Sequence, residues 1–298
     1  MSGDGFRSGF VAVVGRPNVG KSSLVNAMVG QKVSIVADKP QTTRGRIRGV
    51  LTTDQYQIVF TDTPGFHKPR TLLGRRLNRM VEDTTSEDVD VVLLVVDASA
   101  GVGKGDAFVA QHQVAPRAGR KVCAVNKIDL LKGDAALPQL QAAAALASFD
   151  HVVPVSARSG RGVDELVAVL VDALHEGPPY FPAGEVTDQS VEQRIAEIVR
   201  EKVLERTREE IPHSVATQVE EIERRDGITH VSCLVLVERD SQKGIVIGRG
   251  GQMLKEIGTS ARPEIETLLG TKVFLELRVK VQREWQRDAA ALQRLGYG

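Results

Sequence analysis

The chain has 298 residues, of which 42% are hydrophobic and 26% charged, and its formal net charge is +1. This length predicts about two domains, each large enough to bury a core, and the balanced overall charge does not indicate a nucleic-acid partner. Cys123 and Cys233 lie far apart in apolar runs, so neither a disulfide framework nor a cysteine metal site is indicated. No apolar run approaches the roughly 18 residues of a membrane span, and residues 1–9 lack an apolar signal core. We therefore expect a reducing, cytoplasmic setting.

Strand-like and helix-like segments alternate through the first part of the chain. Several of the strand-like runs are apolar without alternation, as in strands that are buried on both faces. The expected strands cover residues 10–14, 57–60, 91–96, 122–125 and 152–155, and the expected helices cover residues 21–29, 72–83, 135–148 and 163–175. This order predicts an α/β fold with a doubly wound sheet.

The alternating pattern stops near Gly177, where Pro178, Pro179 and Pro182 predict a stiff, exposed connection. We place a first domain at residues 1–177, a linker at 178–190 and a second domain at 191–298. The second domain reads as an amphipathic helix at 191–208, strands near 214–222 and 230–237, a glycine-rich turn, a helix from about Gln252 and an alternating strand at 272–281. This order predicts a smaller α+β domain.

A phosphate-binding motif follows the first expected strand. The run Gly15-Arg16-Pro17-Asn18-Val19-Gly20-Lys21-Ser22 has Walker A spacing at a strand-to-helix turn. Its glycines let backbone N–H groups point at phosphate oxygens, and the following helix adds the positive end of its dipole. Lys21 is expected to bridge the β- and γ-phosphates and the Ser22 hydroxyl to bind Mg²⁺. The expected nucleotide contacts here are Gly15, Asn18, Val19, Gly20, Lys21, Ser22 and Ser23.

Two further segments carry groups for the metal and the γ-phosphate. Asp62-Thr63-Pro64-Gly65 ends a buried strand, where Asp62 is placed to hold Mg²⁺ through a water and Gly65 leaves room for its N–H to approach the γ-phosphate. The polar run 38–46 reads as a mobile loop in which Thr43, rather than Thr42, closes the metal shell when a triphosphate is bound. We therefore expect Ser22, Thr43 and Asp62 at the metal, and Lys21, Thr43, Gly65 and Asn18 in catalysis.

Two strand ends carry the groups that select the base. After residues 122–125 comes Asn126-Lys127-Ile128-Asp129, in which the Asp129 carboxylate can accept two hydrogen bonds from the guanine N1–H and amino group. Adenine would present an acceptor to that anion, so this contact discriminates strongly. Lys127 can cover the base plane with its alkyl stem, and Asn126 can tie neighbouring loops together. The tripeptide Ser156-Ala157-Arg158 would complete the pocket through the Ala157 N–H.

With these five segments in order, residues 8–175 look like a translation-factor-related GTPase and resemble the bacterial Era family. Phe66 stands where many such GTPases have a water-orienting Gln, as is usual in Era-like proteins, so slow intrinsic turnover is expected. Related GTPases with Asn at the position of Asn18 use it to help hold K⁺ beside the phosphates. This similarity motivates the hypothesis of potassium-stimulated hydrolysis, with an Asx-type turn as the alternative role of Asn18.

A second glycine turn lies in the C-terminal domain. The run Ile245-Val246-Ile247-Gly248-Arg249-Gly250-Gly251 before a helix has the Gly-x-x-Gly form of a KH domain, which clamps about four single-stranded nucleotides. From Arg239 onward there are 11 Lys and Arg against 7 Asp and Glu, whereas residues 190–238 have 7 against 11. Basic character thus lies with the glycine turn, as expected of an RNA-binding face. The expected RNA contacts are Ile245, Ile247, Gly248, Arg249, Gly250, Gly251 and Lys255.

The order of elements around this turn is similar to the type II KH domain at the C-terminus of Era, so the resemblance spans nearly the whole chain. It implies a GTP and GDP switch with Mg²⁺ that binds the 3′ end of small-subunit (16S) ribosomal RNA and acts in assembly of the 30S ribosomal subunit. We expect a monomer, and peripheral association with the inner face of the cell membrane is left open. The alternatives are a protein-binding regulatory scaffold and a tRNA-modifying GTPase, and the second is disfavoured because no cysteine-bearing C-terminal motif is present.

Overall fold

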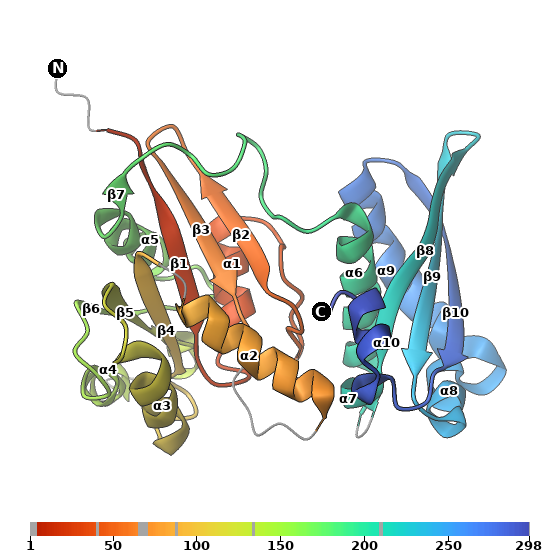
Figure 1. The fold of residues 1–298 in the computed structure, drawn as a ribbon, viewed down its shortest axis with the longest axis horizontal. Helices are drawn as coiled ribbons and strands as arrows, with labels where there is room; N and C mark the ends of the chain where they lie inside the picture. The colour runs from red at the N-terminus through yellow and green to blue at the C-terminus, as the bar shows by residue number, and fades with distance from the viewer. Residues whose placement is uncertain are drawn as a thin grey trace. The chain divides into compact units, whose positions relative to one another are not determined.

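The computed structural model describes residues 5–39, 42–64, 71–86, 89–132, 135–208 and 211–297, with residues 84–86 described by their backbone alone. The chain divides into two compact units (Figure 1). The first comprises Met1–Ser34, Thr43–Pro69 and Leu77–Asp188, and the second Ile35–Thr42, Arg70–Arg76 and Gln189–Gly298. Two short segments from the N-terminal half therefore belong to the second unit.

The first unit is built on a mixed sheet with the strand order β2-β3-β1-β4-β5-β6, in which β7 also pairs with β1. Strands β1, β3, β4, β5 and β6 are parallel, whereas β2 runs antiparallel to β3 and β7 to β1. The strands are β1 (Arg7–Val14), β2 (Ile47–Thr52), β3 (Tyr56–Asp62), β4 (Val91–Asp97), β5 (Arg120–Asn126), β6 (His151–Pro154) and β7 (His175–Glu176). The α-helices are α1 (Lys21–Val29), α2 (Leu72–Ser86), α3 (Lys104–Val109), α4 (Ala136–Ala144) and α5 (Val163–Asp172).

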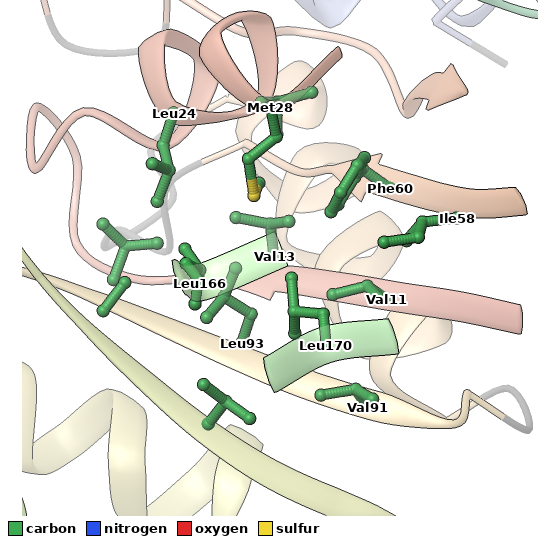
Figure 2. Packing of buried hydrophobic residues seen from close by; sticks show 14 of the residues in the cluster. Val11, Val13, Leu24, Met28, Ile58, Phe60, Val91, Leu93, Leu166 and Leu170 are labelled. Atoms are coloured by element: carbon green, nitrogen blue, oxygen red, sulfur yellow. The ribbon is translucent and has the colours of Figure 1, made fainter. Parts of the chain in front are cut away.

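Successive residues of the central strands belong to different hydrophobic clusters. Val91 and Leu93 of β4 pack in a cluster with residues of α1 and α5, whereas Val92 and Leu94 pack in a cluster with residues of α3 and α4. Figure 2 shows the first cluster, where Leu24 and Met28 of α1 lie over side chains of β1 and β3. Both faces of the sheet are therefore covered, which explains why these strands read as continuous apolar runs and confirms the doubly wound prediction.

Sequence reasoning missed the edge strand β2 and the helix α3. Strand β2 is a six-residue edge strand that pairs with β3 and includes Arg48 and Gly49. It therefore lacks the continuous apolar run that identifies the buried strands in the sequence. Gly49 is needed because a Cβ there would lie 2.9 Å from Val25 of α1. Helix α3 has six residues and continues into a π-helical turn at Ala110–Val114, which is too short for a clear helical period.

The second unit has a three-stranded sheet in the order β10-β9-β8, with β10 parallel and β8 antiparallel to β9. The elements are α6 (Val191–Arg206), α7 (Ile211–Ser214), β8 (Ala216–Arg225), β9 (Ile228–Val237), α8 (Asp240–Ile247), α9 (Gln252–Leu269), β10 (Lys272–Val281) and α10 (Ala289–Arg294). Apolar residues of α6, α8, α9 and the strands form one cluster. The predicted order of a helix, two strands, a glycine-rich turn, a helix and a strand is confirmed, and the structure adds the short helices α7, α8 and α10.

The proline-rich segment after Gly177 is hydrogen-bonded to the first unit as far as Asp188. The buried Gln57 side chain accepts from the N–H groups of Tyr180 and Phe181 and donates to the Phe181 carbonyl. The Val50 N–H donates to the Val186 carbonyl at 2.9 Å. These bonds hold the segment along the sheet edge. In the part of the chain that the structure describes, every helix is too short or too polar to span a bilayer.

Candidate guanine-nucleotide and RNA sites

The Walker segment forms a tight turn between β1 and α1, and two of its glycines are required by their surroundings. Gly20 caps α1 with a left-handed φ of 94°, and a Cβ there would lie 2.4 Å from Nδ2 of Asn126. Gly15 has a φ of 153°, and a Cβ would lie 2.5 Å from the Val95 carbonyl oxygen. No side chain caps α1, so the first N–H groups of the helix point at the turn. These are the features of an anion-binding helix N-terminus.

Lys21 lies beneath this turn. Its Nζ donates to the carbonyl oxygens of Gly15 at 3.1 Å and Arg16 at 2.9 Å, and the side chain is buried. Burial lowers the pKa of the ammonium to about 8, against an opposing effect of Asp62. Phosphate groups placed in the turn would restore the charged form.

Ser22, Thr43 and Asp62 converge from α1, the loop before β2 and the end of β3. Ser22 Oγ donates to Asp62 Oδ2 at 2.7 Å and lies 2.9 Å from Thr43 Oγ1, which is 3.5 Å from the same carboxylate oxygen. Burial raises the pKa of Asp62, and within the described ranges its Oδ1 has no hydrogen-bond partner. Two hydroxyls and a buried carboxylate oxygen are the hard ligands that Mg²⁺ prefers, so these residues fit a magnesium site.

Asn126 ties the loops of the expected base pocket together. Its Nδ2 donates to the Val19 carbonyl at 2.9 Å, and its Oδ1 accepts from the Ala157 N–H at 3.0 Å. The Ala157 N–H, which we expected to face the base, is thus engaged by Asn126. Ser156 Oγ donates to Asp129 Oδ1 at 2.7 Å, which orients the carboxylate.

Lys127 spans from the base pocket to the Walker turn. It has a left-handed φ of 65°, and its Nζ donates to the Asn18 carbonyl at 2.8 Å and to Asp97 Oδ2 at 2.6 Å. Asn18 is itself left-handed and has an exposed side chain.

Sequence reasoning missed Asp97 and the Arg16–Asp106 pair. Burial opposes ionisation of Asp97, but hydrogen bonds from Lys127, Ser99 and Ala100 outweigh it and lower the pKa of the carboxyl. The sequence feature that could have identified Asp97 is its position at the end of an apolar strand. Arg16 Nε lies 2.7 Å from Oδ1 of the buried Asp106 on α3, a contact between distant segments for which the sequence carries no pattern.

The structure brings most of the expected nucleotide residues to the carboxyl ends of β1, β3, β5 and β6, where ligands bind in such sheets. Ser23 lies in the first turn of α1, and Arg158 is exposed after β6. Gly65 and Phe66 lie outside the described residues. The expected roles of these side chains toward a nucleotide stay predictions.

The second glycine turn, like the first, ends at a left-handed glycine that starts a helix. Gly248, Gly250 and Gly251 have φ values of 74°, 59° and 80°, and Gly251 caps the 18-residue helix α9 without a side-chain cap. A Cβ at Gly248 would lie 2.9 Å from the N atom of Met253. Arg249 and Ile245 are exposed, the latter by 53%, as is Lys255. Ile247 is half-buried at the end of α8.

Known proteins share both halves of this arrangement. The 50S ribosome-binding GTPase family matches residues 10–127, and the KH domain family matches residues 210–286. The GTPase Era of Mycolicibacterium smegmatis is 51% identical over 98% of this chain and 99% of its own length, and that of Mycobacterium tuberculosis is 49% identical over the same shares. The chain belongs to the Era family of GTPases.

Solved Era structures resemble this family member over its whole length. A crystal structure of Era in complex with MgGDPNP and nucleotides 1506–1542 of 16S ribosomal RNA is 38% identical, with a TM-score of 0.94, and covers 98% of this chain and 99% of that chain. A variant of Aquifex aeolicus Era bound to GDP and AlF4⁻ is also 38% identical, with a TM-score of 0.94, over 98% of this chain and all of that one. The predicted family, fold and GTPase activity are thereby confirmed.

Proposed function

We propose that this Era-family GTPase binds GTP with Mg²⁺ and binds 16S ribosomal RNA near its 3′ end during assembly of the 30S subunit. The main observation behind this proposal is the pair of glycine turns. Each turn starts a helix at a left-handed glycine with no side-chain cap. The Era structure with MgGDPNP and 16S ribosomal RNA supports assigning one turn to each ligand. In this proposal residues 1–177 act on the nucleotide, 178–190 connect, and 191–298 bind RNA.

On the nucleotide side, the turn from Gly15 to Ser22 holds the phosphates and Lys21 neutralises the β- and γ-oxygens. Ser22, Thr43 and Asp62 hold Mg²⁺, which supplies charge neutralisation at the phosphates. Asp129, oriented by Ser156, accepts hydrogen bonds from guanine. Hydrolysis then depends on positioning and charge rather than on a Gln side chain.

The RNA assignment is tested with the turn itself. Arg249→Glu combined with Gly250→Asp places negative charge at the helix N-terminus and should reduce affinity for a 16S 3′-end oligoribonucleotide by at least about 100-fold at low salt. GDP affinity of the same variant serves as the folding control. Unchanged RNA affinity would contradict the KH assignment, and retained affinity for a protein partner alone would favour the scaffold alternative.

We further propose that K⁺ stimulates hydrolysis through Asn18, whose side chain is exposed on the Walker turn. A cation beside the phosphates would neutralise charge that develops in the transition state. Single-turnover rates should be higher in potassium than in sodium, and Asn18→Ala should remove that difference. Equal rates in the two salts would refute this role.

The oligomeric state and location stay predictions. We expect a cytoplasmic monomer, which light scattering after size exclusion would test. Cosedimentation with anionic lipid vesicles would test peripheral membrane association.

A further inference from the structure

Arg16, in the first half of the Walker turn, extends its side chain to helix α3 of the same unit. Its Nε donates to Asp106 Oδ1 at 2.7 Å, and Asp106 is only 1% exposed. The second carboxylate oxygen, Oδ2, accepts from the Gly103 N–H at 2.9 Å, where α3 begins. Because each oxygen holds a different segment, the carboxylate joins the start of α3 to the Walker turn.

The stem of Arg16 lies against the backbone of α3 at Gly105. A Cβ at Gly105 would lie 2.5 Å from Cδ and 3.4 Å from Cγ of Arg16. Glycine is less favourable than alanine within a helix, so a glycine in the six-residue helix α3 indicates a packing requirement. The close approach of the Arg16 side chain accounts for it.

The backbone of Arg16 holds Lys21. Lys21 Nζ donates to the Arg16 carbonyl at 2.9 Å and to the Gly15 carbonyl at 3.1 Å. Pro17 follows Arg16, restricts Arg16 to extended backbone conformations and offers no N–H to the turn. Since the side chain and the carbonyl of Arg16 belong to one residue with little backbone freedom, a contact that holds the side chain also holds the carbonyl.

The two halves of the Walker turn are held by different segments. In the second half, Lys127 Nζ donates to the Asn18 carbonyl at 2.8 Å and Asn126 Nδ2 to the Val19 carbonyl at 2.9 Å. Helix α3 holds the first half through Arg16. A site that is ordered before its ligand arrives binds more tightly, because binding does not have to order it. Loss of the α3 contact should therefore weaken the hold on phosphates.

We propose that Asp106 and Arg16 are positioning residues for Lys21 and the first half of the Walker turn, and that position 105 is a glycine to admit the Arg16 stem. This inference rests on the proposed role of Lys21 at the β- and γ-phosphates. Because the contacts lead to Lys21, the effect is expected at the phosphates rather than at the base.

The first test is Arg16→Met, which keeps the stem and removes the guanidinium. We expect GDP to dissociate about tenfold faster in a stopped-flow measurement with fluorescent GDP, and kcat/KM for GTP to fall about tenfold. Arg16→Lys keeps a positive charge within reach of Asp106 and should keep both values within about threefold of the wild type. Wild-type GDP dissociation in Arg16→Met would overturn the proposal.

A double variant separates positioning from a loss of stability. Arg16→Met leaves the buried Asp106 carboxylate unpaired, which should lower the urea midpoint. Adding Asp106→Asn removes that charge and should raise the midpoint again, while GDP dissociation stays fast because the contact is still absent. Recovery of slow dissociation together with the midpoint would overturn the proposal.

Two glycine variants of α3 supply a test that leaves the ion pair intact in sequence. Gly105→Ala places a methyl group against the Arg16 stem, so GDP should dissociate several-fold faster although alanine favours the helix and the urea midpoint should not fall. Gly103→Ala is the matched control, because a Cβ there meets no heavy atom of the described residues within 4 Å and the N–H that Asp106 accepts is kept. That variant should release GDP at the wild-type rate, and equal rates in the two variants would contradict the role of Gly105.

Two further measurements identify which proposal fails. Guanosine, which lacks phosphates, should compete equally well for wild-type protein and Arg16→Met, and an equal loss of guanosine and GDP affinity would overturn the positioning role. Lys21→Ala with unchanged GDP affinity would refute the proposed role of Lys21. Weakened GDP binding in Lys21→Ala, together with wild-type rates in Arg16→Met, would refute the positioning role alone.

Discussion

Nucleotide binding should take up a proton, because Lys21 is buried and must be charged to hold phosphates. Its pKa of about 8 in the free protein means that the ammonium is mostly present at pH 7 and is lost as the pH rises through 8. Bound phosphates raise that pKa, so affinity is greatest below pH 8 and falls above it. For one group with this pKa, the apparent Kd rises about fourfold between pH 7 and 8.5, equivalent to about 0.8 kcal/mol.

The assay is calorimetric titration of GDP at pH 8 in buffers of different ionisation enthalpy. The slope of the observed enthalpy against the buffer enthalpy should give an uptake of about half a proton per nucleotide. GDP avoids hydrolysis, and at pH 8 its terminal phosphate, with a pKa of about 6, is almost fully ionised. Guanosine, which lacks phosphates, is the matched control and should take up no proton.

The proton exchange of Asp62 is distinguished from that of Lys21 by repeating the titration with EDTA and with Mg²⁺. Burial raises the pKa of Asp62, so bound Mg²⁺ favours its ionised form and can only release protons. The EDTA series therefore removes the proton release that Mg²⁺ would cause. A buffer-independent enthalpy in EDTA at pH 8, with an unchanged Kd from pH 7 to 8.5, would refute the claim that burial lowers the pKa of Lys21.

Three substitutions test other parts of the two units. Gly20→Ala should weaken GDP binding by at least about tenfold in a fluorescence titration, because φ is 94° and the new Cβ meets a side chain at 2.4 Å; unchanged affinity would show that the turn adapts. Ser156→Ala frees the Asp129 carboxylate and should lower the preference for GTP over ATP about tenfold in competition binding, whereas an unchanged preference would mean that other groups orient it. Trp285→Phe leaves a buried carbonyl without its indole donor and should lower the free energy of unfolding of the second unit by about 1–3 kcal/mol, measured by urea titration with circular dichroism. Thr217→Val is a useful comparison there, because it also removes one buried donor, the Thr217 hydroxyl that bonds to the Ala196 carbonyl at 2.8 Å.

Two kinds of segment were predictable from the sequence. One has a regular spacing of apolar residues over several positions, and the other is a turn that requires glycine. Helix α1 and strand β10 have the predicted bounds, because in each a regular spacing of apolar residues is combined with a turn at one end. Strand β2 was missed because an edge strand with one short pairing partner needs no continuous apolar run.

The positions of candidate nucleotide residues were predictable where a strand ends in a known motif. Contacts between residues far apart in the sequence were not predictable. Asn126 and Asp129 stand in a recognisable order after an apolar strand, whereas the pair of Arg16 with Asp106 joins the Walker turn to α3, and the two segments share no sequence pattern. Ala157 shows a subtler limit. Its position was foreseen, but the amide donor bonds to Asn126, a choice decided by loop geometry rather than by residue order.

The grouping of residues 35–42 with the second unit could not be read from residue order, although a local sign was present. Val33 and Ile35 are apolar residues one position apart, and both are buried, but in different clusters. Neighbouring positions of one loop thus stabilise two different cores.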